Sequence, residues 1–309
     1  MIQSGIIVLN KPQDATSHDS VGMIRRLVGT KKVGHGGTLD PMATGVLPIF
    51  IGKATRVIEY MSESSDDEAK IYRATMRLGY ETDTQDILGE EIWRDEENHE
   101  FPPIAQIEAI FNDFVGEQMQ IPPAYSAVKY KGKRLYEYAR EGKAIEDRML
   151  KSRTIYVKYM HINKCDPGAM EIEFDIACSG GTYIRTICQG VGRKLGNGAV
   201  MSKLIRLKSG PFRIEDSYTI EELQELKERG ADIPMLPIDS AIPALKKLVV
   251  SNNSAKKFAN GLAIGMDECQ SEEMDYANDE TYVAVYDAEL FIGIARCKDG
   301  TIKPHKVII

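Results

Sequence analysis

The chain has 309 residues, of which 43% are hydrophobic and 28% are charged, and its formal net charge is −7. A chain of this length can bury a large core and typically divides into more than one domain. No apolar run approaches the roughly 18 residues that a membrane-spanning helix requires, and the first residues lack the basic segment of a secretory signal. We therefore expect a cytoplasmic globular protein that does not act at a membrane.

The cysteines and histidines do not indicate a metal site. Zinc and redox motifs place cysteines in close pairs such as C-x-x-C, and no two cysteines of this chain have that spacing. The odd number of cysteines favours buried thiols in a reducing compartment. The residues concerned are Cys165, Cys178, Cys188, Cys269 and Cys297, with His18, His35, His99, His161 and His305.

Basic residues concentrate in one segment of this acidic chain. Residues 124–160 carry ten basic and four acidic side chains, a local net charge of +6, and between 129 and 140 the basic residues alternate with tyrosines. A basic face can bind phosphates, and aromatic rings offer a surface on which bases stack. A solvated helix surface is the alternative interpretation. The candidate backbone contacts to a nucleic acid are Lys129, Lys131, Lys133 and Arg134.

In chain order, the first elements are a strand and a helix. Residues 5–9 predict a buried strand, and a turn follows at 10–12. Apolar residues at helical spacing predict a helix over about 19–29. Residues 16–19 can cap its start, and Gly29 is suited to end it.

The stretch at 34–56 has the most distinctive pattern of the chain. Three glycines surround His35, and glycine permits a positive φ or a close approach to a ligand. Asp40 follows, and Pro41 pushes it toward extended geometry. The apolar run at 46–51 predicts a buried strand, and 54–61 a short helix. Since Gly, Asp and Pro are turn residues, the pattern fits an ordinary turn as well as a loop that presents a carboxylate.

The middle of the chain predicts a sheet with helices. Residues 70–79 alternate as a strand does, and Tyr72 shares the apolar face, which by spacing alone favours a core tyrosine. A helix is expected at 104–115. The segment 118–127 is extended, and its two prolines exclude a central strand.

Further strands are predicted at 153–164, 170–177 and 204–212, and a helix at 220–228. Between the second and third strands, a glycine turn leads into a helix that begins near Tyr183 and Arg185 and ends at about 195. A buried arginine at that position would need an anionic partner.

Prolines at 234, 237 and 243 predict a domain boundary, which we place between residues 240 and 241. Beyond it, a helix at 252–260 and strands at about 281–287, 290–296 and 303–309 predict a small β-rich domain packed on its neighbour.

Six ordered blocks carry a resemblance to a known family. They are GIIVLNKP at 5–12, GHGGTLDP at 34–41, YRA at 72–74, IPPAYSA at 121–127, LYEYAR at 135–140 and GTYIRT at 181–186. In this order the blocks resemble those of the bacterial tRNA pseudouridine-55 synthases of the TruB type, and the resemblance covers nearly the whole chain.

The resemblance implies an α+β fold with a mixed, largely antiparallel sheet and flanking helices. Residues 1–240 would form the catalytic domain, with a basic RNA-gripping insertion at about 124–155, and 241–309 a PUA-like RNA-binding barrel. The family converts one uridine of the tRNA TΨC stem-loop to pseudouridine without a cofactor or a metal. A monomer is expected, because neither a coiled-coil pattern nor a large apolar face is evident.

The resemblance also implies roles for individual residues. Asp40 matches the catalytic aspartate and Arg185 the arginine paired with it, while Tyr72 matches the tyrosine that stacks on the target uracil and helps to remove the C5 proton. His35 matches the histidine that enters the RNA loop. The other implied substrate-site positions are Tyr183 and Leu204, which match base contacts, and Lys11, in a Lys-Pro motif that supports the site.

Three chemical routes fit an ionised carboxylate: addition to C6, attack on C1′, or removal of the C2′ proton. The residues do not separate them. Two other functions are considered: a non-catalytic tRNA-binding or tRNA-folding protein that uses the same surface, and a small-molecule hydrolase. A hydrolase would need a second acid or base opposite Asp40, and no comparable block supplies one.

Overall fold

The computed structural model describes residues 4–62, 70–97, 100–143, 145, 149–269, 281–298 and 300–309. His99 lies outside them, as do three charged residues of the segment 124–160, Glu146, Asp147 and Arg148. The chain divides into two compact units. Unit 1 comprises residues 1–41, 45–68 and 209–309, and unit 2 comprises 42–44 and 69–208.

The N-terminal strands of unit 1 form a small antiparallel ladder. β3 (Thr44–Ile51) pairs with β1 (Gly5–Lys11) on one edge and with β2 (Val33–His35) on the other. α1 (Ser17–Val28) and α5 (Ile220–Glu228) contribute side chains to the core cluster beneath the ladder, which includes Ile7, Ile24 and Leu223. The 3-10 helix η1 (Gly52–Ser62) follows β3.

The start and the end of α1 confirm the prediction from its flanking residues. Thr16 is the N-cap and forms a capping box with Asp19, and Gly29 ends the helix with φ +70°. The helix therefore begins at Ser17, slightly before the predicted residue 19, because the cap lies at the first residue of the predicted capping segment.

The C-terminal part of unit 1 is the predicted small β-rich domain. Its sheet has the order β14-β16-β17-β18-β15, in which β14 and β16 are parallel and the other pairs antiparallel. The bounds are β14 (Lys246–Val250), α6 (Asn252–Ala259), β15 (Ile264–Gly265), β16 (Thr281–Asp287), β17 (Leu290–Lys298) and β18 (Thr301–Val307).

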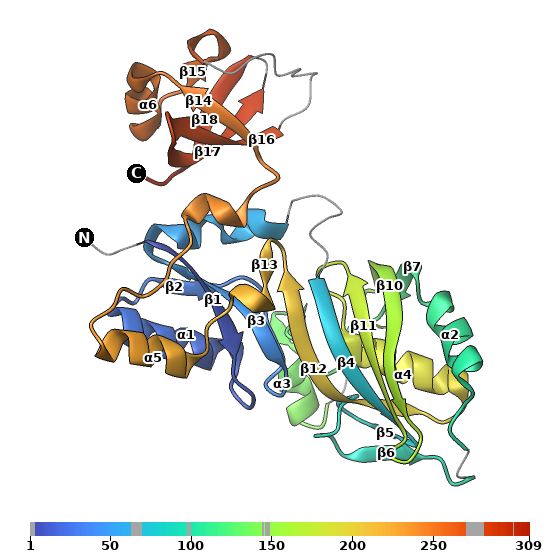
Figure 1. The fold of residues 1–309 in the computed structure, drawn as a ribbon. Helices are drawn as coiled ribbons and strands as arrows, with labels where there is room; N and C mark the ends of the chain where they lie inside the picture. The colour runs from blue at the N-terminus through green and yellow to red at the C-terminus, as the bar shows by residue number, and fades with distance from the viewer. Residues whose placement is uncertain are drawn as a thin grey trace. The chain divides into compact units, whose positions relative to one another are not determined.

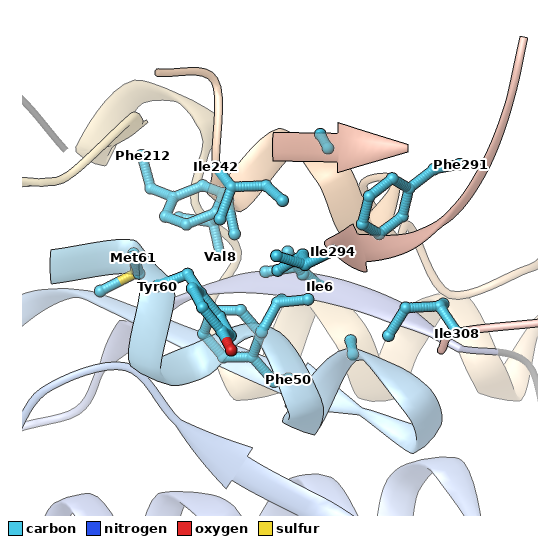
Figure 2. Close-up of a cluster of buried hydrophobic side chains, with 14 of the residues drawn as sticks. Ile6, Val8, Phe50, Tyr60, Met61, Phe212, Ile242, Phe291, Ile294 and Ile308 are labelled. Atoms are coloured by element: carbon cyan, nitrogen blue, oxygen red, sulfur yellow. The ribbon is translucent and has the colours of Figure 1, made fainter. Parts of the chain in front are cut away.

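An apolar cluster joins this sheet to the N-terminal part of unit 1. Phe291, Ile294 and Ile308 lie in one buried cluster with Ile6 of β1 and Tyr60 of η1 (Figure 2). This cluster packs the C-terminal sheet against β1 and η1 within unit 1. The proposed domain boundary between 240 and 241 stays a prediction.

Unit 2 is built on an antiparallel sheet with the strand order β12-β4-β11-β10-β7. Both α2 and α4 lie along it (Figure 1), and α2 contacts α4 and β10. The bounds are β4 (Lys70–Leu78), α2 (Ile104–Asp113), β7 (Gly116–Gln120), β10 (Arg153–Asp166), β11 (Glu171–Cys178), α4 (Ile184–Leu195) and β12 (Ala199–Ser209).

The sequence missed part of unit 2. β12 begins at Ala199, whereas the sequence predicted a start at residue 204. The prediction began too late because a bulge between Met201 and Lys203 breaks the alternation that marks a strand. Two short antiparallel hairpins of unit 2, β5 with β6 and β8 with β9, were also not predicted.

The remaining elements of unit 2 are β5 (Tyr80–Thr82), β6 (Glu91–Arg94), β8 (Lys129–Tyr130), β9 (Lys133–Arg134) and α3 (Leu135–Arg140). Those of unit 1 are β13 (Phe212–Arg213), η4 (Ile214–Asp216), η5 (Ile238–Ala241) and η6 (Met266–Glu268).

Within the described ranges, no helix combines the length and the apolar character needed to cross a bilayer.

Candidate active site

Asp40 lies in the loop between β2 and β3 of unit 1, where its side chain is half-buried. The residues on either side of it are fixed by buried side chains. Ser17, the first residue of α1, donates its hydroxyl to the carbonyl of Leu39 at 3.2 Å and accepts the Leu39 N–H at 2.9 Å. The loop carries the carboxylate on a backbone that the start of α1 holds in place.

Lys11 secures the other side of Asp40. Its ammonium group is fully buried and donates to the carbonyls of Pro12, Ala15 and Pro41 at 2.8, 2.6 and 3.0 Å. A buried ammonium needs several acceptors to offset its lost hydration, and three backbone oxygens provide them. The role of the Lys-Pro motif at a substrate site stays a prediction.

The glycines of this loop are explained by packing and by turn geometry. A Cβ at Gly36 would lie 2.9 Å from the Met61 methyl and from the ring of Phe50. Gly37 has φ +97°, a conformation that other residues rarely adopt. His35 ends β2 opposite Ile49 and is half-buried, and its entry into an RNA loop stays a prediction.

Tyr72 lies on β4 of unit 2 and is only 6% exposed, flanked by Ile176 of β11 and Arg206 of β12. The apolar neighbours fit the core interpretation. Arg206 adds a polar feature, because its fully buried side chain hydrogen-bonds to the Tyr72 side chain. Burial lowers the pKa of Arg206, and the contact with Tyr72 opposes that shift.

Arg206 is a candidate that the sequence analysis missed. The predicted strand at 204–212 places Arg206 between two apolar residues, Ile205 and Leu207, and a cation in such a stretch was the available signal. Lys70, at the start of β4, is affected by the same environment. Burial and then the positive charge of Arg206 lower the pKa of Lys70 to about 8.

Arg185 lies on the first turn of α4, at the start of the helix where the sequence placed it. It is buried, with only 4% of its surface exposed. Its guanidinium donates to the carbonyls of Thr84 and Tyr125 at 2.8 and 3.0 Å. Its Nε lies 4.0 Å from a carboxylate oxygen of Asp86. Its pairing with Asp40 stays a prediction.

Asp86 belongs to the acidic turn after β5. Its carboxylate accepts from the Thr84 hydroxyl at 2.7 Å and from the Leu88 N–H at 3.0 Å. Gln85, at φ +65°, accepts a hydrogen bond from Thr186 of α4 at 2.8 Å. The turn thus holds carbonyl and carboxylate oxygens against α4. The local sequence does not reveal these contacts, because the partner on α4 is about a hundred residues away.

Tyr183 is the N-cap residue of α4, and Gln120 holds its backbone. The Gln120 amide accepts the Tyr183 N–H at 2.8 Å and donates to its carbonyl at 3.1 Å. The guanidinium of Arg153 lies over the Tyr183 ring, 5.4 Å from its centroid. Leu204 of β12 is buried opposite Ala74. Whether Tyr183 and Leu204 contact a base stays a prediction.

The basic segment forms the β8–β9 hairpin and α3. Lys129, Lys131 and Arg134 are exposed, whereas Lys133 is half-buried and forms an ion pair with Glu141. The cations cover tyrosine rings: Lys131 covers Tyr130, Lys133 covers Tyr138, and both Arg134 and Arg140 cover Tyr136. The hairpin therefore offers exposed cations beside aromatic surface.

Comparison with known proteins gives the family. Residues 25–184 match the model of the TruB family pseudouridylate synthase N-terminal domain. Residues 185–249 match the tRNA pseudouridylate synthase B C-terminal domain, and 247–308 the C-terminal domain of pseudouridine synthase II TruB. The chain belongs to the TruB family of pseudouridine synthases.

Relatives named tRNA pseudouridine synthase B match this TruB-family chain along its whole length. The protein of Halalkalibacterium halodurans is 40% identical over 100% of this chain and 98% of its own. The protein of Bacillus subtilis is 39% identical over 99% of this chain and 98% of its own. The family expected from the six blocks is confirmed.

Solved structures support the fold. The archaeal box H/ACA sRNP Nop10-Cbf5 complex contains a chain 26% identical, with a TM-score of 0.73, over 100% of this chain and 87% of that one. A Cbf5-Nop10-Gar1 complex gives 26% identity and a TM-score of 0.74, over 100% and 86%. The predicted α+β class with a largely antiparallel sheet is confirmed, and the C-terminal sheet is consistent with a PUA-like domain.

Proposed function

We propose that this chain isomerises uridine 55 in the TΨC loop of tRNA to pseudouridine, with Asp40 as the catalytic carboxylate. The observation that carries the proposal is the position of Asp40 in a loop fixed on both sides by the buried groups of Ser17 and Lys11. The full-length similarity to proteins named tRNA pseudouridine synthase B supports the choice of substrate. A cytoplasmic monomer is part of the same proposal.

The reaction needs no added group. The C1′–N1 bond breaks, the uracil turns, C1′ joins C5, the proton on C5 leaves, and N1 gains a proton. An ionised Asp40 begins the sequence by adding to C6, by attacking C1′ or by removing the C2′ proton. In the proposal Arg185 provides the positive charge that keeps Asp40 ionised and oriented.

The target base must leave the RNA stack before it reacts, at a cost of about a few kcal/mol. In the proposal the ring of Tyr72 stacks on the extruded uracil and helps to remove the C5 proton, and His35 fills the vacated space. Tyr183 and Leu204 contact the base. Lys129, Lys131, Lys133 and Arg134 bind the RNA backbone.

Incubation with an unmodified tRNA transcript, followed by mapping of pseudouridine at single-nucleotide resolution, tests activity and site together. Asp40→Asn is expected to abolish product while tRNA binding remains, because the amide cannot act as a nucleophile or base. Asp14→Asn is the matched control, since it removes one exposed carboxylate of the same unit. Product from Asp40→Asn at the wild-type rate would contradict the role of Asp40.

The same measurements address the alternative of a tRNA-binding or tRNA-folding protein without catalysis. That alternative predicts tight tRNA binding with no pseudouridine at any nucleotide in the wild-type reaction.

A further inference from the structure

Ser17 joins the start of α1 to the residue that precedes Asp40. Its hydroxyl both donates to and accepts from the Leu39 backbone, at 3.2 and 2.9 Å, across 22 residues of sequence. Both residues are buried, with Ser17 at 3% and Leu39 at 4% exposure. A buried peptide group needs hydrogen-bond partners, and here one side chain satisfies both the N–H and the C=O of Leu39.

The backbone at Ser17 is held by the capping box of α1. Ser17 follows the N-cap Thr16, whose hydroxyl accepts the Asp19 N–H at 3.0 Å, while the Asp19 carboxylate accepts the Thr16 N–H at 2.9 Å. This capping box fixes the first turn of the helix, and Ser17 with it. A hydroxyl fixed in this way can define the position of a distant loop.

Lys11 provides a second attachment, at Pro41. Asp40 therefore lies between Leu39 and Pro41. Their backbone groups are held by Ser17, the first residue of α1, and by Lys11, the last residue of β1. Of these two attachments, only that of Ser17 holds both the backbone N–H and the backbone C=O of its partner residue. It therefore fixes the orientation as well as the position of the chain that enters Asp40. Pro41 restricts the geometry on the other side.

We propose that Ser17 is a positioning residue for catalysis: it sets the direction of the Asp40 carboxylate through the Leu39 backbone. The inference rests on the proposed role of Asp40. A displacement of about 1 Å at a reacting group can reduce a rate by about a hundredfold. Ser17 does not contact substrate in this proposal, so its loss reduces the chemical rate and leaves tRNA affinity unchanged.

Ser20 gives a matched control on the same helix. Its hydroxyl is fully buried and donates to the Thr16 carbonyl at 3.2 Å, one turn back. Ser20→Ala removes a buried hydroxyl of α1 as Ser17→Ala does, but the hydrogen bond it removes goes to Thr16 and not to the β2–β3 loop. Any difference between the two variants reports on the contact with Leu39.

The test measures single-turnover pseudouridine formation with enzyme in excess over tRNA, the tRNA dissociation constant, and thermal unfolding. Ser17→Ala is expected to form product about tenfold or more slowly than Ser20→Ala, with dissociation constants within about twofold. Equal rates in the two variants would overturn the proposal, as would a slower rate explained entirely by weaker tRNA binding.

Two further variants keep the result interpretable. If Ser17→Ala does not fold, Ser17→Cys replaces it, because a thiol is a similar size but a weaker hydrogen-bonding group, and the same loss of rate is expected. Asp40→Asn separates the two proposals. If Asp40→Asn is inactive while Ser17→Ala reacts at the control rate, only the role of Ser17 is wrong. If Asp40→Asn is fully active, the role of Asp40 itself is wrong.

Discussion

At the scale of single residues, two neighbouring cations of unit 2, one buried and one half-buried, are the chemically unusual groups. Arg206 is fully buried in β12, and it is hydrogen-bonded to Tyr72, the tyrosine expected to stack on the uracil. Lys70 lies two residues from Tyr72 on the same face of β4, since alternate residues of a strand point the same way. The positive charges of Lys70 and Arg206 repel each other.

Burial of Lys70, together with this repulsion, gives a pH dependence to stability. The folded-state pKa of Lys70 is lowered from 10.5 to about 8. Between these values the unfolded chain binds the proton and the folded chain does not, so the contribution of Lys70 to stability rises with pH across that window. Below about pH 8 both states hold the proton, and the folded state bears the cost of a buried charge.

We predict that Lys70→Met is more stable than the wild type at pH 7 and that this advantage shrinks as the pH rises from about 8 to 10.5. Urea unfolding at several pH values measures the difference in the free energy of unfolding. Lys158→Met, at an exposed position of β10, is the control. An advantage of Lys70→Met that stays constant across the window would contradict the assignment.

At the scale of elements, local patterns predicted most of the architecture. α1, β4 and the C-terminal strands were found because capping residues and alternation are local signals. The contacts of Ser17, Asp86 and Arg206 were not found, because each depends on a partner from a distant element. Asp40 itself was identified by its resemblance to a family block, since an acid in a glycine turn is compatible with an ordinary loop.

The β2–β3 loop shows how packing restricts a glycine. A methyl group at Gly36 would meet both Met61 and the ring of Phe50, a core residue, at 2.9 Å. We expect Gly36→Ala to lower the free energy of unfolding by about 1–3 kcal/mol, as overpacking typically does. Gly180→Ala is the control, because nothing lies within 4 Å of its Cβ position. Equal melting temperatures for the two variants would show that the loop can shift to accept the methyl group.

At the scale of the whole molecule, the chain is acidic but presents a basic hairpin. Lys129 and Lys131 are exposed on it, and each phosphate contact releases counterions from the RNA, so the affinity falls with salt. We predict that Lys129→Ala and Lys131→Ala each weaken tRNA binding and reduce the slope of log affinity against log salt by roughly 0.7–0.9. Fluorescence titrations over a range of salt concentrations measure this slope, and a flat wild-type response would exclude a basic binding face.

Unit 1 combines the two ends of the chain. Ile6 of β1 exchanges both backbone hydrogen bonds with Leu236, at 3.0 and 2.8 Å, and it shares a buried cluster with Ile294 and Ile308 of the C-terminal sheet. The ladder that supports Asp40 is therefore completed by residues from the last third of the sequence.

This arrangement affects how the protein is made on the ribosome. Ile6 is synthesised early, and its partner Leu236 emerges about 10–50 s later at typical translation rates of about 5–20 residues per second. Throughout that interval one edge of β1 is unpaired and its apolar residues lack part of their core. An unpaired strand edge is a site for wrong pairing with other chains. The nascent chain is thus exposed to wrong pairing at β1, the strand next to the one that leads out of the β2–β3 loop.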